Sequence, residues 1–243
     1  MASKSKTGLS NVISEVNVGR RLMHSLTAVP ALAYLLGIFT WFEIQVFVSF
    51  GFIVVFVLEF DRLVLGNSFF DPLYRDYEQE VPAGYAYSVT GLFLAVNLFR
   101  PEIACVSVLL LSWADPLAGM LGSGKLKPVK PRKMLTSMFV ISLGVILFVD
   151  VFFSEGIIAI VGRNNLDPNM FHDFPPVSIS LPMMLGGALA STVADGVKLC
   201  ITSEGTSLPY LTMDIDRDGY ILDDNITIPV YSGVVMTLVS ALF

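Results

Sequence analysis

The sequence predicts an all-α membrane protein, a polytopic bundle of about seven transmembrane helices. Of its 243 residues, 54% are hydrophobic and only 15% are charged, whereas about 25% charged residues are usual in soluble domains. The mean hydropathy is +0.70. Because a spanning helix needs about 20 apolar residues, seven helices would occupy most of the chain. These observations exclude an ordinary soluble enzyme, a disordered chain and a disulfide-bonded scaffold.

Seven apolar segments define the predicted spans, and Pro or aromatic residues stand near their ends. They cover residues 22–41, 43–60, 83–99, 102–121, 134–153, 181–201 and 226–243. Residues 1–18 are predicted to form a polar N-terminal tail, and residues 19–243 a single transmembrane domain. Cys105 and Cys200 both fall inside predicted spans, where we expect buried thiols.

The distribution of Lys and Arg predicts a cytoplasmic N-terminus. With that orientation, 13 of the 15 cations lie on the inner side, and only Arg100 and Arg163 lie on the outer side. This asymmetry also favours an odd number of spans. We therefore expect a multi-pass protein of the cell membrane. The acidic pI near 4.8 favours a prokaryotic, archaeal-like host, and an endomembrane is the expected location in a eukaryote.

Four ionisable side chains lie within the predicted spans, where charge is costly and marks candidate functional sites. They are His24, Glu59, Asp115 and Asp195. Asp115 and Asp195 each follow the outer end of a span by 13 residues, which places both carboxylates about 20 Å below the outer surface. We expect one polar layer beneath the cytoplasmic face. The alternative is local pairing, of Asp195 with Lys198 and of Glu59 with Arg62.

A basic loop follows Asp115 and combines five cations in nine residues with two glycines. These residues are Gly122, Gly124, Lys125, Lys127, Lys130, Arg132 and Lys133. Glycines allow a turn whose N–H groups face an anion, and Lys and Arg bind phosphate oxygens. An adjacent carboxylate suits Mg²⁺, so the segment fits phosphoryl or nucleotidyl chemistry. The alternative is a topogenic loop that also attracts anionic lipids.

The acidic loop 203–225, which precedes the last span, allows three interpretations. Asp218-Gly219 is a strong two-residue turn and predicts a small cytoplasmic β-hairpin over 210–225. The segment from Asp214 also fits the first eight positions of an EF-hand calcium loop, although Asn225 replaces the Glu of position twelve. The third interpretation is a solvated acidic turn.

The order of the motifs resembles the CTP-dependent lipid-alcohol kinases, which comprise dolichol, phytol and CTP-type diacylglycerol kinases and are related to phosphatidate cytidylyltransferases. The matching segments are Arg20-Arg-Leu-Met-His24, Leu58-Glu-Phe-Asp-Arg62-Leu, Tyr85-Ala-Tyr-Ser-Val-Thr-Gly91, Ala114-Asp115-Pro-Leu-Ala-Gly-Met-Leu-Gly122, Ala190-Ser-Thr-Val-Ala-Asp195 and Asp224-Asn225-Ile-Thr-Ile-Pro229. One departure is Lys133-Met-Leu-Thr136-Ser137, because the family has Glu-Gly after this Lys.

The resemblance implies an integral membrane kinase that transfers a phosphoryl group from a nucleoside triphosphate, CTP, to a lipid alcohol at the cytoplasmic face. A polyprenol, diacylglycerol or a diether glycerol would be the substrate, Mg²⁺ the cofactor, and nucleic acid no partner. The expected catalytic residues are Asp115, Asp195, His24 and Glu59, and the expected metal ligands are Asp115, Asp195 and Asp224. The expected nucleotide-binding residues are Gly122, Gly124, Lys125, Lys127, Lys130, Lys133 and Asn225.

Two other functions are compatible with the sequence. A cation-coupled transporter would bind ions at Asp115 and Asp195, although the chain has neither an evident inverted repeat nor a pair of interrupted helices. A non-catalytic family member would have kept the fold and lost the nucleotide site, which the missing Glu-Gly after Lys133 favours.

Overall fold

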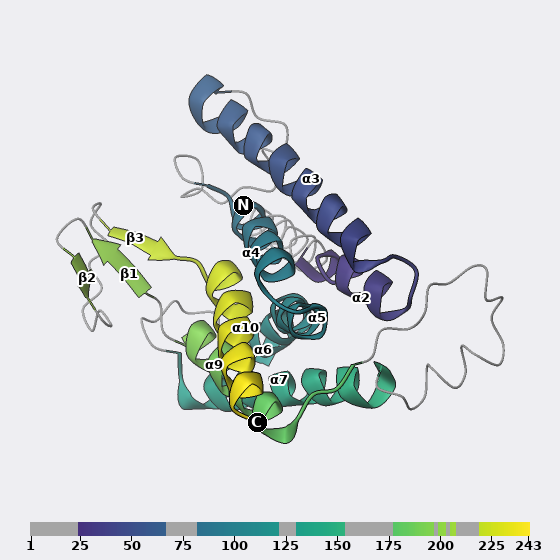
Figure 1. Ribbon diagram of the computed structural model, residues 1–243. Helices are drawn as coiled ribbons and strands as arrows, with labels where there is room; N and C mark the ends of the chain where they lie inside the picture. The colour runs from purple at the N-terminus through teal and green to yellow at the C-terminus, as the bar shows by residue number, and fades with distance from the viewer. Residues whose placement is uncertain are drawn as a thin grey trace, which may run out of the picture.

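The computed structural model describes residues 24–66, 82–121, 130–153, 177–196, 199–202, 205–207 and 219–243. These residues form a helical bundle with a small sheet at its side (Figure 1). The helices are α2 (Val29–Leu35), α3 (Trp41–Phe60), α4 (Gly84–Leu98), α5 (Pro101–Leu109), α6 (Asp115–Leu121), α7 (Arg132–Phe153), α9 (Leu181–Gly196) and α10 (Asp224–Leu242). Two π-helical turns, η1 (Asp61–Leu65) and η4 (Leu110–Ala114), continue α3 and α5.

Within the described part of the chain, four helical stretches are long and apolar enough to cross a membrane. They are Trp41–Leu65, Pro101–Met120, Arg132–Phe153 and Asp224–Leu242. Helices α4 and α9 coincide with two further predicted spans but have only 15 and 16 residues. The predicted helical membrane bundle is thus confirmed in its class, whereas the number of seven spans and the cytoplasmic N-terminus stay predictions.

The first predicted span, residues 22–41, is wrong as a continuous helix over the residues that the structure describes. Residues 24–26 are helical, and the longest described helix of the segment is α2, which has seven residues and Pro30 in its first turn. Turns at 27–28 and 36–37 interrupt the segment, and Gly37 has a φ of 67°. This left-handed conformation ends a right-handed helix and is readily adopted by glycine.

The sixth predicted span, residues 181–201, is wrong at its end. Helix α9 stops at Gly196, and the chain then enters strand β1 (Leu199–Thr202), so Cys200 lies in a strand and not in a helix. Strand β1 lies between β2 (Gly205–Ser207) and β3 (Gly219–Leu222), antiparallel to both. A short apolar run fits a strand as well as a helix, and the pairing with β3 decides between them.

The predicted hairpin over 210–225 is therefore realised differently. Strand β3 begins at the predicted turn, but its described partner is β1, with Cys200 opposite Ile221. The proposed first strand of the hairpin and the first five positions of the calcium-loop motif lie outside the described residues. In Figure 1 the sheet lies beside the end of the bundle at which α10 begins.

Helix α5 and the turn η4 form the centre of the bundle. Every residue from Ile103 to Leu111 is at most 1% exposed. Around this centre α9 packs against α7 and α10, and a side chain at Gly187 would lie 2.8 Å from Sδ of Met236 and 3.3 Å from Cδ1 of Ile146. Small residues permit such close helix contacts in membranes. The central helix α5 leads through η4 directly into Asp115, the first residue of α6.

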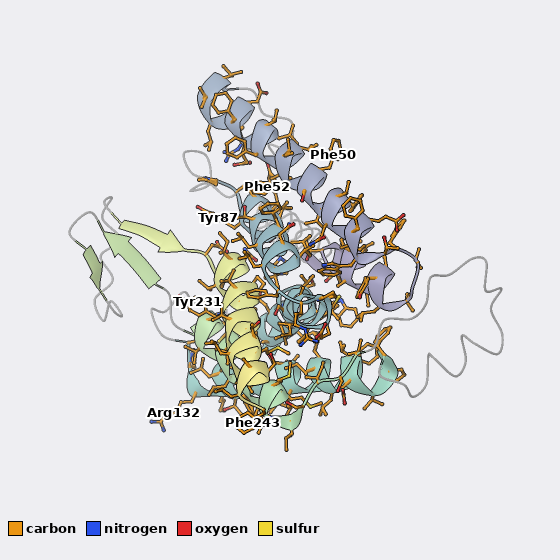
Figure 2. The ribbon with its side chains drawn as sticks, viewed as in Figure 1. Phe50, Phe52, Tyr87, Arg132, Tyr231 and Phe243 are labelled. Atoms are coloured by element: carbon orange, nitrogen blue, oxygen red, sulfur yellow. The ribbon has the colours of Figure 1, made fainter. Side chains whose placement is uncertain are left out.

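Helix α3 projects from the bundle and exposes most of its apolar side chains (Figure 1). Of the 18 most apolar consecutive residues between Trp41 and Leu65, only 11% are buried. Phe50 points away from the bundle, whereas Phe52 stacks on Phe93 of α4 with ring centroids 4.4 Å apart (Figure 2). A helix that is apolar on all sides is typical of one that faces lipid.

Candidate functional site

Three aspartates from separate helices meet at one end of the bundle. Asp115 is the first residue of α6, Asp195 lies in the last turn of α9, and Asp224 is the first residue of α10. One carboxylate oxygen from each lies within 4.8 Å of the other two. An all-oxygen set of this kind has the chemistry that Mg²⁺ and Ca²⁺ prefer. We call these three residues the carboxylate cluster.

Local backbone features aim two of the three carboxylates. The N–H of Asp115 donates to the carbonyl of Leu110, five residues earlier, as in a π-helix. Such wide turns reorient side chains and are frequent at functional sites. At the start of α10 the Asp223 carboxylate accepts from the N–H of Asn225 at 2.9 Å. This cap fixes the first turn of the helix and hence the position of Asp224.

Lys130 provides the nearest positive charge. Its ammonium group forms an ion pair with Asp195, and Nζ lies 3.9 Å from Oδ2 of Asp224. Its backbone N–H donates to the carbonyl of Gly196 at 3.4 Å. Burial alone lowers the pKa of the Lys130 amine, but the carboxylates of Asp195 and Asp115 outweigh it and raise this pKa above its ordinary value. The ammonium form is therefore favoured beside the cluster.

His24 contacts the cluster through Asp115. Its Nε2 lies 3.5 Å from Oδ2 of Asp115, and Nδ1 lies 3.3 Å from Oγ of Ser88 on α4. Thr27 fixes this segment, because its hydroxyl donates to the His24 carbonyl at 2.6 Å and lies 2.6 Å from Oγ of Ser112 in η4. His24 therefore connects Asp115 with α4.

Glu59 lies in a second polar group, apart from the carboxylate cluster. It pairs with Arg62 at 2.6 Å, and it accepts from the hydroxyl of Tyr85 and from the N–H of Ala83 at 3.1 Å. Both Glu59 and Arg62 are buried. This group joins the end of α3 to the start of α4, so it supports the helix that carries Ser88. Glu59 thus pairs locally with Arg62, as the alternative interpretation of the sequence predicted.

The remaining predicted site residues divide into two groups. Lys133 is exposed on the first turn of α7, and Asn225 is half-buried next to Asp224. Four predicted nucleotide-binding residues lie outside the described part of the chain: Gly122, Gly124, Lys125 and Lys127. Lys198, the partner of Asp195 in the alternative interpretation, also lies outside it, and the described partner of Asp195 is Lys130.

Sequence reasoning missed the hydroxyl groups around His24. Ser88, Thr27 and Ser112 all lie in apolar segments, where a hydroxyl needs a partner. Ser88 follows Tyr85 by three residues and therefore shares its helix face. This spacing was the available signal that Ser88 lies near the ionisable layer.

Helices α4 and α10 approach closely beside the cluster. A Cβ atom on Gly91 would lie 3.0 Å from Cγ of Pro229, 3.3 Å from the carbonyl carbon of Asn225 and closer still to its oxygen. Pro229 has no N–H, so the carbonyl of Asn225 cannot receive the usual helical hydrogen bond from residue 229. Gly91 thus lets α4 contact this carbonyl directly, one residue from Asp224.

Comparison with known proteins finds three similar fungal sequences. The chain is 27% identical to CTP-dependent diacylglycerol kinase 1 of Saccharomyces cerevisiae over 99% of its own length and 79% of the yeast protein. It is 26% identical to the protein of the same name from Eremothecium gossypii, over 98% and 72% of the two chains. The Schizosaccharomyces pombe protein is 38% identical over 71 residues, 28% of this chain and 32% of its own. No protein-family model and no solved structure matches the chain.

Proposed function

We propose that this chain is a membrane lipid kinase that uses CTP, on the basis of its resemblance to the CTP-type lipid kinases, which the similarity to the fungal proteins supports. Its reaction would transfer the γ-phosphoryl group of CTP to the hydroxyl of a lipid alcohol. Diacylglycerol is the first candidate substrate, because the similar fungal proteins are named for it. A polyprenol or a diether glycerol is the second.

The observation that carries the proposal is the meeting of three carboxylates and one ammonium group from distant parts of the chain. Phosphoryl transfer requires little covalent chemistry from the protein, and depends on positioning and charge stabilisation. The three carboxylates fit a divalent cation, as their oxygen chemistry and the ammonium group beside Asp195 and Asp224 indicate. A cation bound there would neutralise charge on the phosphates. Lys130 would supply a further positive charge to the phosphate oxygens.

The place of the cluster in the bundle suits a lipid substrate and a soluble co-substrate. Asp195 lies near the end of α9 and Asp224 at the start of α10, so the cluster is at the ends of apolar helices. A lipid hydroxyl at the membrane boundary and a nucleotide from the aqueous side would meet there. The bias of Lys and Arg supports the cytoplasmic side for this face.

His24 has a positioning role in this proposal. It holds the Asp115 carboxylate from one side while Ser88 holds the imidazole ring from the other. Partners of this kind orient a ligand residue and limit its rotation. Glu59 acts one step further away, because its carboxylate accepts from the hydroxyl of Tyr85 at the start of α4.

The departure after Lys133 lies beside the cluster. Leu135, two residues later, packs on Gly196, so that a Cβ on this glycine would overlap the Leu135 side chain. The start of α7 therefore contacts the end of α9 through apolar atoms next to Asp195. Activity measurements decide whether this contact replaces the family's Glu-Gly or accompanies a loss of catalysis.

The test is a kinase assay on the purified chain in detergent, with Mg²⁺, CTP and either diacylglycerol or a polyprenol. We expect a lipid phosphate and CDP, and we expect Asp115→Asn to abolish both. Asp150→Asn is the matched control, because Asp150 on α7 accepts from the N–H of Ile179 at 3.2 Å and an amide can keep that bond. Folded protein without turnover on either lipid would refute the proposed function.

A further inference from the structure

The ammonium group of Lys130 lies beside two of the three carboxylates that would bind a metal ion. It is paired with Asp195 and lies 3.9 Å from Asp224. The oxygens of these two residues and of Asp115 lie within 4.8 Å of one another. Three carboxylates at this spacing repel one another, so a cation among them stabilises the arrangement. Lys130 supplies such a positive charge beside Asp195 and Asp224, and Nε2 of His24 lies 3.5 Å from Oδ2 of Asp115.

A bound ammonium group and a divalent cation are competitors for the same oxygens. The ammonium can make three hydrogen bonds, and it is a compact, strongly hydrated charge on a flexible stem of four carbons. It can therefore leave the cluster through rotation of its own side chain. Phosphate oxygens are an alternative partner for it, with at least as much negative charge as the carboxylates that it leaves.

We propose that Lys130 is a competing internal cation, which holds the carboxylate cluster until nucleotide phosphates withdraw it and thereby makes metal binding depend on the nucleotide. The inference rests on the proposed function, since it takes CTP as the nucleotide. It adds an order to the reaction: a divalent cation binds poorly alone and well as its complex with the nucleotide. The metal ion then binds to the carboxylate cluster only together with the nucleotide phosphates whose charge it neutralises.

The coupling has a thermodynamic consequence. If the nucleotide raises the affinity for the metal by some factor, the metal raises the affinity for the nucleotide by the same factor. Coupling between two sites is typically about 5-fold to 150-fold. For Lys130 we expect about tenfold or more, because the ammonium contacts one metal-binding carboxylate and lies near a second.

The experiment compares four forms of the full chain in detergent: wild type, Lys130→Met, Lys130→Arg and Arg132→Met. Mn²⁺ is the probe, titrated alone and as the preformed Mn²⁺–CTP complex, since CTP itself chelates the ion. Protein-bound Mn²⁺ is measured by proton relaxation enhancement and by the rise in melting temperature. Arg132 is the matched control because its exposed side chain points away from the bundle (Figure 2), yet its loss changes the net charge equally.

We expect wild type, Lys130→Arg and Arg132→Met to bind Mn²⁺–CTP at least about tenfold more tightly than Mn²⁺ alone. In Lys130→Met, Mn²⁺ alone should bind about tenfold more tightly than in wild type, and the preference for the complex should be lost. Equal Mn²⁺ affinity in wild type and Lys130→Met would overturn the inference. So would an Arg132→Met variant that behaves like Lys130→Met, since the effect would then be one of net charge.

A second measurement needs no substitution and applies even if Lys130→Met fails to fold. Acetic anhydride labels amines, and mass spectrometry gives the labelling of Lys130 relative to the exposed Lys133. Saturating Mn²⁺ should displace the Lys130 ammonium and increase its relative labelling; an unchanged ratio would contradict the competition. Lys130-dependent Mn²⁺ binding without lipid phosphorylation would count against the proposed function alone. Phosphorylation without this dependence would count against the competition alone.

Discussion

Substituting Gly91 by Ala tests whether close packing of α4 on α10 positions the carboxylate cluster. The added Cβ would lie 3.0 Å from Cγ of Pro229 and closer than that to the carbonyl oxygen of Asn225. Ordinary contacts between carbon and carbonyl oxygen are about 3.3–3.6 Å. The first turn of α10 is backbone and cannot rotate away as a side chain would, so the two helices must separate by about 1 Å.

Two effects of this separation can be estimated. Overpacking of a tight core costs about 1–3 kcal/mol, which corresponds to a fall in melting temperature of about 2–12 °C for a chain of this size. Asn225 is adjacent to Asp224, so the carboxylate moves with the helix start. A misplacement of about 1 Å at a reacting centre can reduce the rate about 10²-fold. We therefore expect Gly91→Ala to reduce the rate of lipid phosphorylation strongly and to lower the melting temperature only moderately.

The assay is thermal unfolding in detergent together with lipid phosphorylation by CTP. Gly144→Ala is the control, because Gly144 lies in α7 and an added Cβ there meets nothing within 4 Å. Replacing a glycine within an open helix face by Ala stabilises a protein by about 0.5–1 kcal/mol. The two identical substitutions should thus have effects of opposite sign on stability. If Gly91→Ala kept the melting temperature and turnover of wild type, the close approach would not be what positions Asp224.

Three further outcomes follow from the same geometry. Glu59→Gln removes the charged partner of the buried Arg62, so the free energy of unfolding should fall by about 3 kcal/mol; an unchanged melting temperature would show that the pair does not join α3 to α4. His24→Asn should lower kcat about 10-fold to 100-fold with little change in the KM for CTP, because His24 orients Asp115; a rise in KM alone would instead indicate contact with the nucleotide. Chelation of divalent cations by EDTA should abolish turnover and Mg²⁺ should restore it, whereas activity that persists in EDTA would contradict a metal role for the cluster.

The helices were predictable because their signal is local. An apolar run of about 20 residues must satisfy its backbone within itself in a membrane, and a helix does so. The predicted segments 43–60, 83–99, 102–121 and 134–153 correspond closely to the helices observed. The prediction of one continuous helix over 22–41 failed because it gave more weight to the hydropathy of the segment than to its Pro and Gly, which interrupt the helix.

Depth along a helix was also predictable, but direction around it was not. Counting residues from the span ends placed Asp115 and Asp195 at the same depth, and their carboxylate oxygens are indeed close. The same count grouped Glu59 with them, although it faces Arg62 and Tyr85 instead. Rotation about the axis depends on packing against neighbours, which hydropathy does not contain.

The partners of the buried charges were the least predictable part of the site. The alternative interpretation paired Asp195 with Lys198, three residues away, which lies outside the described residues. The described partner of Asp195 is Lys130, 65 residues away. Such a pairing depends on how α7 and α9 pack. Close contacts at small residues, such as Gly187 of α9 against Ile146 of α7, determine that packing. No spacing rule within one helix can identify it.

The origin of the counter-charge distinguishes the two polar groups of this bundle. Arg62 lies three residues after Glu59, and the oxygens of Glu59 also accept from Tyr85 and Ala83. This carboxylate is satisfied by fixed neighbours, so exchanging them for a ligand would disrupt the joint between α3 and α4. The carboxylate cluster has its counter-charge from Lys130, which precedes α7 and can move its ammonium without unwinding a helix. A buried charge whose partner can leave at low conformational cost is suited to binding an external cation, and for this reason the cluster, rather than Glu59, is the candidate site of chemistry.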